Sequence, residues 1–447
     1  MSLPLLVPVR QPVDEVWYQR LQSSAAVLSE LWAYLGPTDE VLRRSFETFV
    51  ASGYHEAPSL CPDGSLTERI ETDVKSLRSL CDEIAGSTAE SWIKEAYESR
   101  IKELLANADL YQAACLADSE RFVAVNQELY GLPDESIFWA CIAWLSQRTQ
   151  AAPVVKDAFA SFLTKLHRVE KGDANILRPP EHVFLRQREL HMGENGFYGQ
   201  LFAGMVLPTA SVDVEYGDKL VRQLLQNISA DDYEIVDSTD GYWSVRASRK
   251  QVARPAVYEI NAEEFLGTVG HEVGSHLLER INGGRQPLRL LGSGLEHYER
   301  GNEGRALIRE QVVYDSWRSF ELQPRWFEVV CRYVAIALAA GVDGKKRDFY
   351  EVFEMMMRIM EAYAISQGGL GNVPRRTIAL QAWRLVTRAL KGSSDRGAAY
   401  YKDMVYLQGN IACWKTAVDD ESAVCWGDRG KITIADRTQL ELIRLFA

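Results

Sequence analysis

The order of hydrophobic and polar positions divides the chain into three parts. Up to about residue 167, apolar residues recur every three or four positions with charges between them, as in segments 66–85 and 91–116. This spacing predicts helices that bury one face. Short strand-like runs and one helix, at 218–228, follow, and from residue 261 the pattern is helical again. The predicted strands are 205–207, 211–215, 233–236, 242–246 and 256–260.

These patterns predict an α+β fold that is mostly helical. Glycines and prolines interrupt the helical pattern near residue 175, and such residues mark chain breaks. We therefore expect an N-terminal helical region over residues 1–175 and a second region over residues 176–447. Within the second region we expect a small sheet at about 205–260, then helices at about 262–320 and further C-terminal helices.

Segment 261–284 has the marks of a complete helix. Asn261 is a good N-cap, and Glu264 three positions later completes a capping box. Gly283 and Gly284 stand where a left-handed residue would end the helix. The sequence therefore predicts one helix of about twenty residues here.

This helix carries His271, Glu272 and His276, which read H-E-x-x-x-H. The metallopeptidase signature H-E-x-x-H places its histidines four apart on one helical face. A spacing of five turns them about 140° apart in a regular helix, too far to share an ion. A single π-bulge realigns them, and Gly274 between them would ease it. The triplet therefore indicates either a coincidence or a metal site on a bulged helix.

A catalytic zinc site needs a third protein ligand and one position left for water. Residues 302–320 predict a further helix that Asn302 would cap. Glu303 in its first turn could face the histidines, as in gluzincins. Glu310, two turns later, is either a solvated acid or a hydrogen-bond partner of a ligand histidine. The downstream candidates for the third ligand are Glu296, His297, Glu299, Glu303 and Glu310.

The residues after His271 resemble a known family, the MATCAP-like tyrosine carboxypeptidases. Its pattern of HEIGTH, QPLRL and QEGLA is matched in register by HEVGSH at 271–276, QPLRL at 286–290 and NEGRA at 302–306. Weaker likeness extends to segments 36–58 and 129–137, so the resemblance covers much of residues 35–320.

The resemblance implies a zincin-like fold of the gluzincin type. It implies one Zn²⁺ per chain, held by His271, His276 and Glu303, with Glu272 as the catalytic glutamate. It further implies a carboxypeptidase that removes a C-terminal tyrosine or phenylalanine. Two residues depart from the QEGLA pattern, Asn302 and Arg305. Arg305 puts the substrate preference in doubt, because it would change the charge near the metal helix.

Such an enzyme needs further groups. Glu272 would act as general base on zinc-bound water. An arginine would bind the terminal carboxylate through two hydrogen bonds, and a donor would stabilise the oxyanion. Segment 256–260 could pair as a sheet edge with an extended substrate. The candidate arginines are Arg289, Arg254 and Arg305, and the candidate oxyanion donors are Tyr298 and Tyr314.

Charge and cysteine content limit the kinds of binding partner and the cellular compartment that we expect. The 447 residues include 62 acidic and 50 basic side chains, a net charge of −12, which gives no support to binding nucleic acid or membranes. Tubulin, the substrate associated with eukaryotic family members, is not expected, because its tails are also acidic. The seven cysteines are scattered, as free thiols are in a reducing compartment. With no recognisable signal peptide, we expect a cytoplasmic protein that acts on a peptide or protein C-terminus.

Other functions stay open at this stage. A metalloendopeptidase would use the same ligands. A binding or regulatory protein could keep the zinc fold without turnover, and a helical scaffold would bind no metal. The sequence does not determine the oligomeric state.

Overall fold

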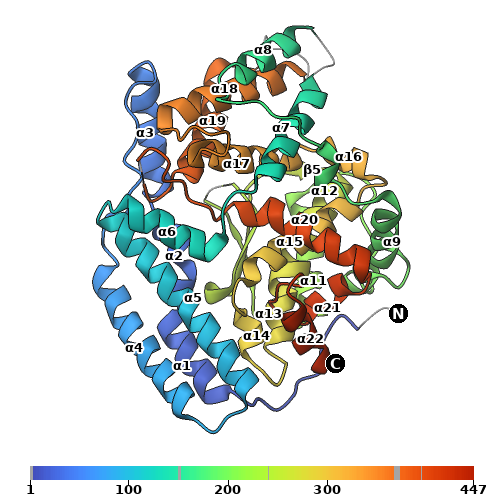
Figure 1. Ribbon diagram of the computed structural model, residues 1–447. Helices are drawn as coiled ribbons and strands as arrows, with labels where there is room; N and C mark the ends of the chain where they lie inside the picture. The colour runs from blue at the N-terminus through green and yellow to red at the C-terminus, as the bar shows by residue number, and fades with distance from the viewer. Residues whose placement is uncertain (1–3, 150–152, 240, 367–372, 394, 447) are drawn as a thin grey trace.

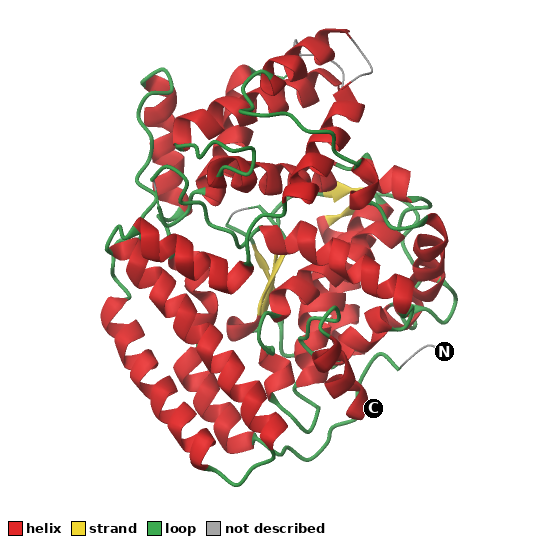
Figure 2. Cartoon of the chain, viewed as in Figure 1, coloured by secondary structure: helices red, strands yellow, loops and turns green. Residues whose placement is uncertain are grey.

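The computed structural model describes residues 4–149, 153–239, 241–366, 373–393 and 395–446. The chain is mostly helical and has two small sheets (Figure 2), which confirms the mostly helical α+β class. Among the described residues, no helix has both the length and the apolar character needed to cross a bilayer. The seven cysteines all lie in described segments and are free thiols.

The first helices form a bundle at one end of the molecule (Figure 1), where α1 packs on α4, α4 on α5 and α5 on α6. Helix α4 buries Ile70, Leu77, Leu80 and Ile84 at intervals of three, four and seven, so the predicted one-face burial is confirmed. The helices of this bundle are α1 (Glu15–Ala25), α2 (Leu31–Tyr34), α4 (Thr67–Gly86), α5 (Ser91–Cys115) and α6 (Ser119–Tyr130). Helix α3 (Asp39–Ala51) lies apart from it, beside α18 and α19.

A second group of helices combines residues from both sides of position 175. Helix α8 packs against α18, and α7 packs against α17. The Phe49 ring of α3 lies 4.8 Å from the Trp383 ring of α19. Because these contacts cross position 175, the division there stays a prediction. The helices of this group are α7 (Glu135–Thr149), α8 (Pro153–Leu163), α17 (Pro324–Ala340), α18 (Phe349–Ser366) and α19 (Arg375–Ala389).

The remaining helices surround the H-E-x-x-x-H segment. Helix α15 packs along α20 on one side and against α12 on the other. The helices of this group are α9 (Glu181–Met192), α10 (Phe197–Leu201), α11 (Val214–Asn227), α12 (Ala262–His271), α13 (Leu278–Gly283), α14 (Leu290–Ser293), α15 (Tyr298–Val312), α16 (Trp317–Glu321), α20 (Met404–Asp419), α21 (Ala423–Trp426) and α22 (Arg437–Leu445).

The two sheets are smaller than predicted and partly differ from the prediction. One has the order β2-β4-β3, with β4 parallel to β2 and antiparallel to β3. The other pairs β1 with β5. The strands are β1 (Val212–Asp213), β2 (Glu234–Asp237), β3 (Ser244–Arg246), β4 (Gln251–Arg254) and β5 (Glu259–Ile260).

Four details correct the predicted strands. Residues 205–207 form no strand. Helix α11 starts at Val214, because Asp213 caps it by accepting the Tyr216 N–H at 2.8 Å, and this shortens the strand predicted at 211–215. The central strand β4 was not predicted. Of segment 256–260, only Glu259–Ile260 forms a strand, β5. Strand β3 contacts the segment Glu272–Leu277.

Segments from both ends of the chain meet at α13. The Asn282 side chain accepts the Val7 N–H at 3.0 Å and donates to the carbonyls of Leu5 and Asp428, each at 2.9 Å. Asp428 belongs to the short 3₁₀ turn Gly427–Arg429 that precedes α22. The helix that follows the H-E-x-x-x-H segment is thus held by both terminal segments.

Candidate metal centre

The helix that bears the two histidines begins and bends as the sequence predicts. The Asn261 side chain accepts the Glu264 N–H at 2.7 Å and caps α12. After His271 the backbone becomes a π-helix over Glu272–Leu277, which confirms the predicted bulge. The expected left-handed end is absent, since Gly284 has φ −66°.

The bulge turns both histidines to one side. The ring centroids of His271 and His276 are 4.8 Å apart. Gly274 is needed between them, because a Cβ there would lie 2.6 Å from Cζ of Phe197. The aromatic ring of α10 therefore fills the space beneath the bulge, which explains a glycine at this position.

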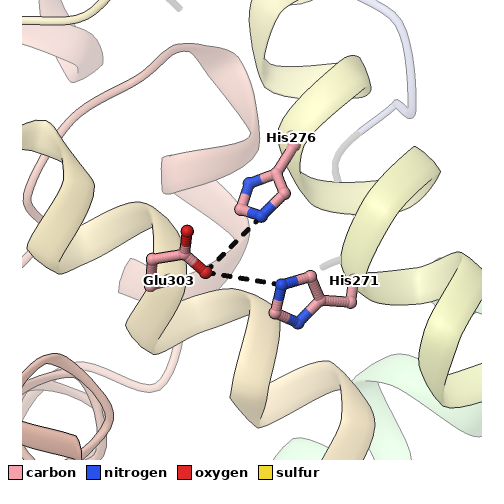
Figure 3. A group of neighbouring side chains, drawn as sticks. All are labelled: His271, His276 and Glu303. Atoms are coloured by element: carbon pink, nitrogen blue, oxygen red, sulfur yellow. Dashed lines mark ion pairs between the residues drawn. The ribbon is translucent and has the colours of Figure 1, made fainter. Parts of the chain in front are cut away.

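Glu303 approaches the histidines from α15 (Figure 3). Its Oε2 lies 3.4 Å from Nε2 of His271 and 3.5 Å from Nε2 of His276. The helix begins at Tyr298. The prediction that Asn302 caps it is therefore wrong, and Glu303 lies in its second turn. His297 takes the N-cap position with a left-handed backbone, φ 56°, and its side chain makes no capping hydrogen bond.

The spacing of these three groups fits a divalent metal ion. Ligand atoms about 2.0–2.1 Å from a tetrahedral zinc ion are about 3.4 Å apart, close to the two observed separations. The three ligand atoms all lie within 4.8 Å of one another. Oε2 of Glu303 is buried and has no hydrogen-bond partner among the described residues. A buried carboxylate oxygen without a hydrogen bond is costly, and a bound cation would reduce that cost.

The site is strongly charged. Burial favours the neutral form of Glu303, but His276 and His271 outweigh it and hold the pKa of this carboxyl well below its usual range. Burial likewise opposes protonation of His271, yet Glu310 and Glu303 raise its pKa to about 9. The carboxylates therefore favour a positive charge at this position, which a proton or a metal ion can supply.

Glu310 holds the far side of His271. Its Oε1 lies 2.5 Å from Nδ1 of that ring and 2.8 Å from Nη2 of Arg325. The Glu310 side chain is 5% exposed, whereas that of Arg325 is 44% exposed. A carboxylate at Nδ1 fixes the tautomer that leaves Nε2 free for a metal.

Glu272 lies beside the three groups without joining them. Its Oε1 is 4.0 Å from Nε2 of His271, and its Oε2 accepts the Val245 N–H at 3.2 Å. Val245 is the middle residue of the edge strand β3. The side chain is 9% exposed, so β3 holds a nearly buried carboxylate next to the candidate metal position.

The other candidates for the third ligand lie elsewhere. Nδ1 of His297 is 3.6 Å from Glu103, and its Nε2 is 3.8 Å from Glu296. Glu299 pairs with Lys402. Among the described residues, the metal-type cluster consists of His271, His276 and Glu303.

All three candidate arginines for the substrate carboxylate form contacts within the protein. Arg254 forms two hydrogen bonds to Asp218, at 2.9 and 3.0 Å, and also pairs with Asp237. Arg289 donates to the carbonyls of Gly284 and Arg10. Both guanidinium groups thus already have hydrogen-bond partners within the protein. A role of Arg254 or Arg289 in substrate binding stays a prediction.

The third arginine, Arg305, is fully buried. Its Nη2 is 2.9 Å from Glu279, and its Nη1 is 3.4 Å from Asp428. The Asn302 amide also donates to the Glu279 carboxylate. Both departures from the QEGLA pattern thus contact one buried glutamate. A buried charge needs such partners, so Glu279 explains both residues.

The two candidate tyrosines differ in their surroundings. Two cations lie close to the Tyr298 ring, Arg100 at 5.2 Å and Lys431 at 5.1 Å from its centroid. Tyr314 packs against Phe320, with ring centroids 5.8 Å apart. Their predicted role as oxyanion donors is untested.

Sequence reasoning missed two arginines near the site, Arg325 and Arg309. Arg325 lies just after the proline that opens α17, and no local motif marks it. Arg309 is two turns beyond Glu303 on α15 and is fully buried. Arg325 reaches the site through Glu310 on α15, and Arg309 bonds Gly274 and Ser275 of the π-helix. Both contacts join separate helices, so no local sequence pattern records them.

The comparisons with known proteins bear on this geometry. Residues 210–421 match the family model described as microtubule-associated tyrosine carboxypeptidase. The predicted resemblance is confirmed. The tyrosine carboxypeptidase match includes α12, the π-helix and α15, and it indicates a peptidase. Searches of curated proteins and of solved structures found no match.

Proposed function

We propose that the protein is a zinc-dependent metallocarboxypeptidase that removes a C-terminal aromatic residue from a peptide or protein. One observation carries the proposal: His271, His276 and Glu303 converge at ligand spacing, and the buried Glu303 oxygen has no hydrogen-bond partner among the described residues. The family match supports the reaction class, and the aromatic preference rests on that match alone.

Each residue of the site has a distinct task in this proposal. His271, His276 and Glu303 would hold a zinc ion, which when bound lowers the pKa of water and polarises a carbonyl. Glu272 takes a proton from the attacking water and passes it to the leaving amine. The Val245 N–H orients the Glu272 carboxylate, and Glu310 orients His271.

The proposal is tested with short peptides that end in Tyr, Phe or Ala, and with the same peptides blocked as C-terminal amides. We expect release of Tyr and Phe from the free acids only, loss of activity on chelation and recovery with zinc. Equal cleavage of the amides would instead identify a metalloendopeptidase. Bound zinc without cleavage would indicate a binding or regulatory protein. If the purified protein bound no metal, it would be a helical scaffold.

A carboxypeptidase also needs a cation for the terminal carboxylate of its substrate. Arg325 fits this task better than the three arginines considered from the sequence. It contacts the Glu310 carboxylate that holds His271, and it is 44% exposed. Since Glu310 is its one ion-pair partner among the described residues, part of its five-donor fork stays available for a second carboxylate.

Replacing Arg325 by Met is expected to raise KM for a free-acid peptide about 10- to 100-fold, because a charge-assisted hydrogen bond contributes about 1.5–3 kcal/mol. Steady-state kinetics on free-acid and amide peptides measures this change. R318M, at an exposed arginine of α16, is the matched control. An unaltered KM in R325M with normal zinc content would exclude Arg325 as the anchor.

A further inference from the structure

The π-helix creates a hydrogen-bonding problem in its own backbone. In a regular α-helix the Leu278 N–H would donate to the Gly274 carbonyl. Here it donates to the carbonyls of Val273 and Ser275 instead. The bulge that aligns the histidines thus takes this backbone donor away from Gly274, and the helix interior gives little access to water to replace it.

The Arg309 guanidinium meets this need. Its Nη1 donates to the Gly274 carbonyl and, at 2.7 Å, to Oγ of Ser275. Ser275 Oγ in turn donates to the Gly270 carbonyl at 3.0 Å. One buried side chain from α15 therefore bonds the bulge at two consecutive residues between the two histidines.

Arg309 is itself held in place from two further directions. Its Cζ lies 3.8 Å from the centroid of the Phe197 ring, the ring that fills the space under Gly274. Its Nη2 pairs with the Asp428 carboxylate. Asp428 stands beyond residue 421, where the family match ends, and its backbone carbonyl accepts from Asn282 on α13.

We infer that Arg309, held by Asp428, is a positioning residue that maintains the π-bulge and so sets the separation of His271 and His276 for a divalent metal ion. A regular helix would turn the histidines about 140° apart, so the metal affinity depends on the bulge. The C-terminal segment thereby contributes to a site that it does not touch. The inference rests on the proposed zinc site, not on peptide hydrolysis.

The test measures zinc affinity of the full-length protein by chelator competition, without substrate. For R309K and R309M we expect the zinc Kd to rise about 10- to 100-fold, the usual effect of losing a group that orients metal ligands. Lysine keeps the charge but lacks the planar fork that bonds the bulge and Asp428 together. The visible spectrum of the Co²⁺-substituted variants should change as the ligand geometry relaxes.

R347M is the matched control. Arg347 is also fully buried and pairs with Asp343 at 2.6 Å. Its other side-chain hydrogen bonds within the described part of the chain go to the carbonyls of Leu338, Lys345 and Lys165, which lie outside the metal helix. It should lose stability and keep zinc Kd and the Co²⁺ spectrum of the parent protein. Equal zinc Kd in R309M, R347M and the parent would overturn the inference.

A milder variant keeps the test decisive where R309M does not fold. S275A removes one of the two bonds to the bulge and should raise the zinc Kd about threefold to tenfold. An unchanged Kd in folded S275A would count against the inference. A parent protein that binds zinc but cleaves nothing would end the peptidase proposal while leaving this inference intact, whereas a parent that binds no zinc would end both.

Discussion

Replacing Glu272 by glutamine is expected to lower kcat by about 10³- to 10⁴-fold, at the upper end of what general acid–base catalysis contributes. Glutamine keeps the size and can still accept the Val245 N–H, but it cannot take a proton from water. Zinc content should stay at one per chain, because Glu272 lies outside the ligand cluster. The measurement is single-turnover hydrolysis of a free-acid peptide together with metal analysis.

The matched control is E263Q, on the same helix but exposed in its first turn. It should keep full activity and metal content. Undiminished turnover by E272Q would remove Glu272 as the base. Loss of zinc in E272Q would mean that the side chain supports the metal position rather than the proton transfer.

The metal helix was predictable because its determinants are local. The cap at Asn261 and the five-residue histidine spacing are read within twenty residues, and the π-helix follows from that spacing once a shared ion is assumed. Local spacing alone could not identify Glu303 as the third ligand, since it lies on a separate helix. The register of the NEGRA segment with a known family identified it.

The surroundings of the site depend on contacts that no local pattern records. Arg254 looked available in the sequence, but its carboxylate partners Asp218 and Asp237 lie 36 and 17 residues away. Strand β4 was missed because its four residues, Gln-Val-Ala-Arg, show no alternation of apolar and polar positions. A central strand is paired on both edges, so its burial comes from its neighbours rather than from its own pattern.

The buried ion pair of Glu279 is a second feature that the sequence alone did not predict. From the sequence, Arg305 suggested an altered charge at the substrate site. In the structure its charge is matched by Glu279 and Asp428. Arg305 thus contacts Glu279 on α13, the helix that follows the π-helix. In the proposed function, other residues such as Arg325 would set the charge near the substrate.

Replacing Glu303 by glutamine is expected to have the second large effect, a loss of the metal itself. Glutamine keeps the shape but removes the charge that both histidines stabilise. Zinc sites gain about 10–16 kcal/mol from about four ligands, so losing one should raise the zinc Kd by more than about 100-fold. Activity should fall with zinc occupancy and recover partly at high zinc concentration.

This recovery separates E303Q from E272Q, in which added zinc should restore nothing. The matched control is E299Q, one turn earlier on α15, where the glutamate pairs with Lys402. Its partly exposed ion pair contributes little, so E299Q should bind zinc like the parent protein. If E303Q also kept parental zinc affinity, the three side chains in Figure 3 would be an ion-pair cluster, and the proposed metal centre would be wrong.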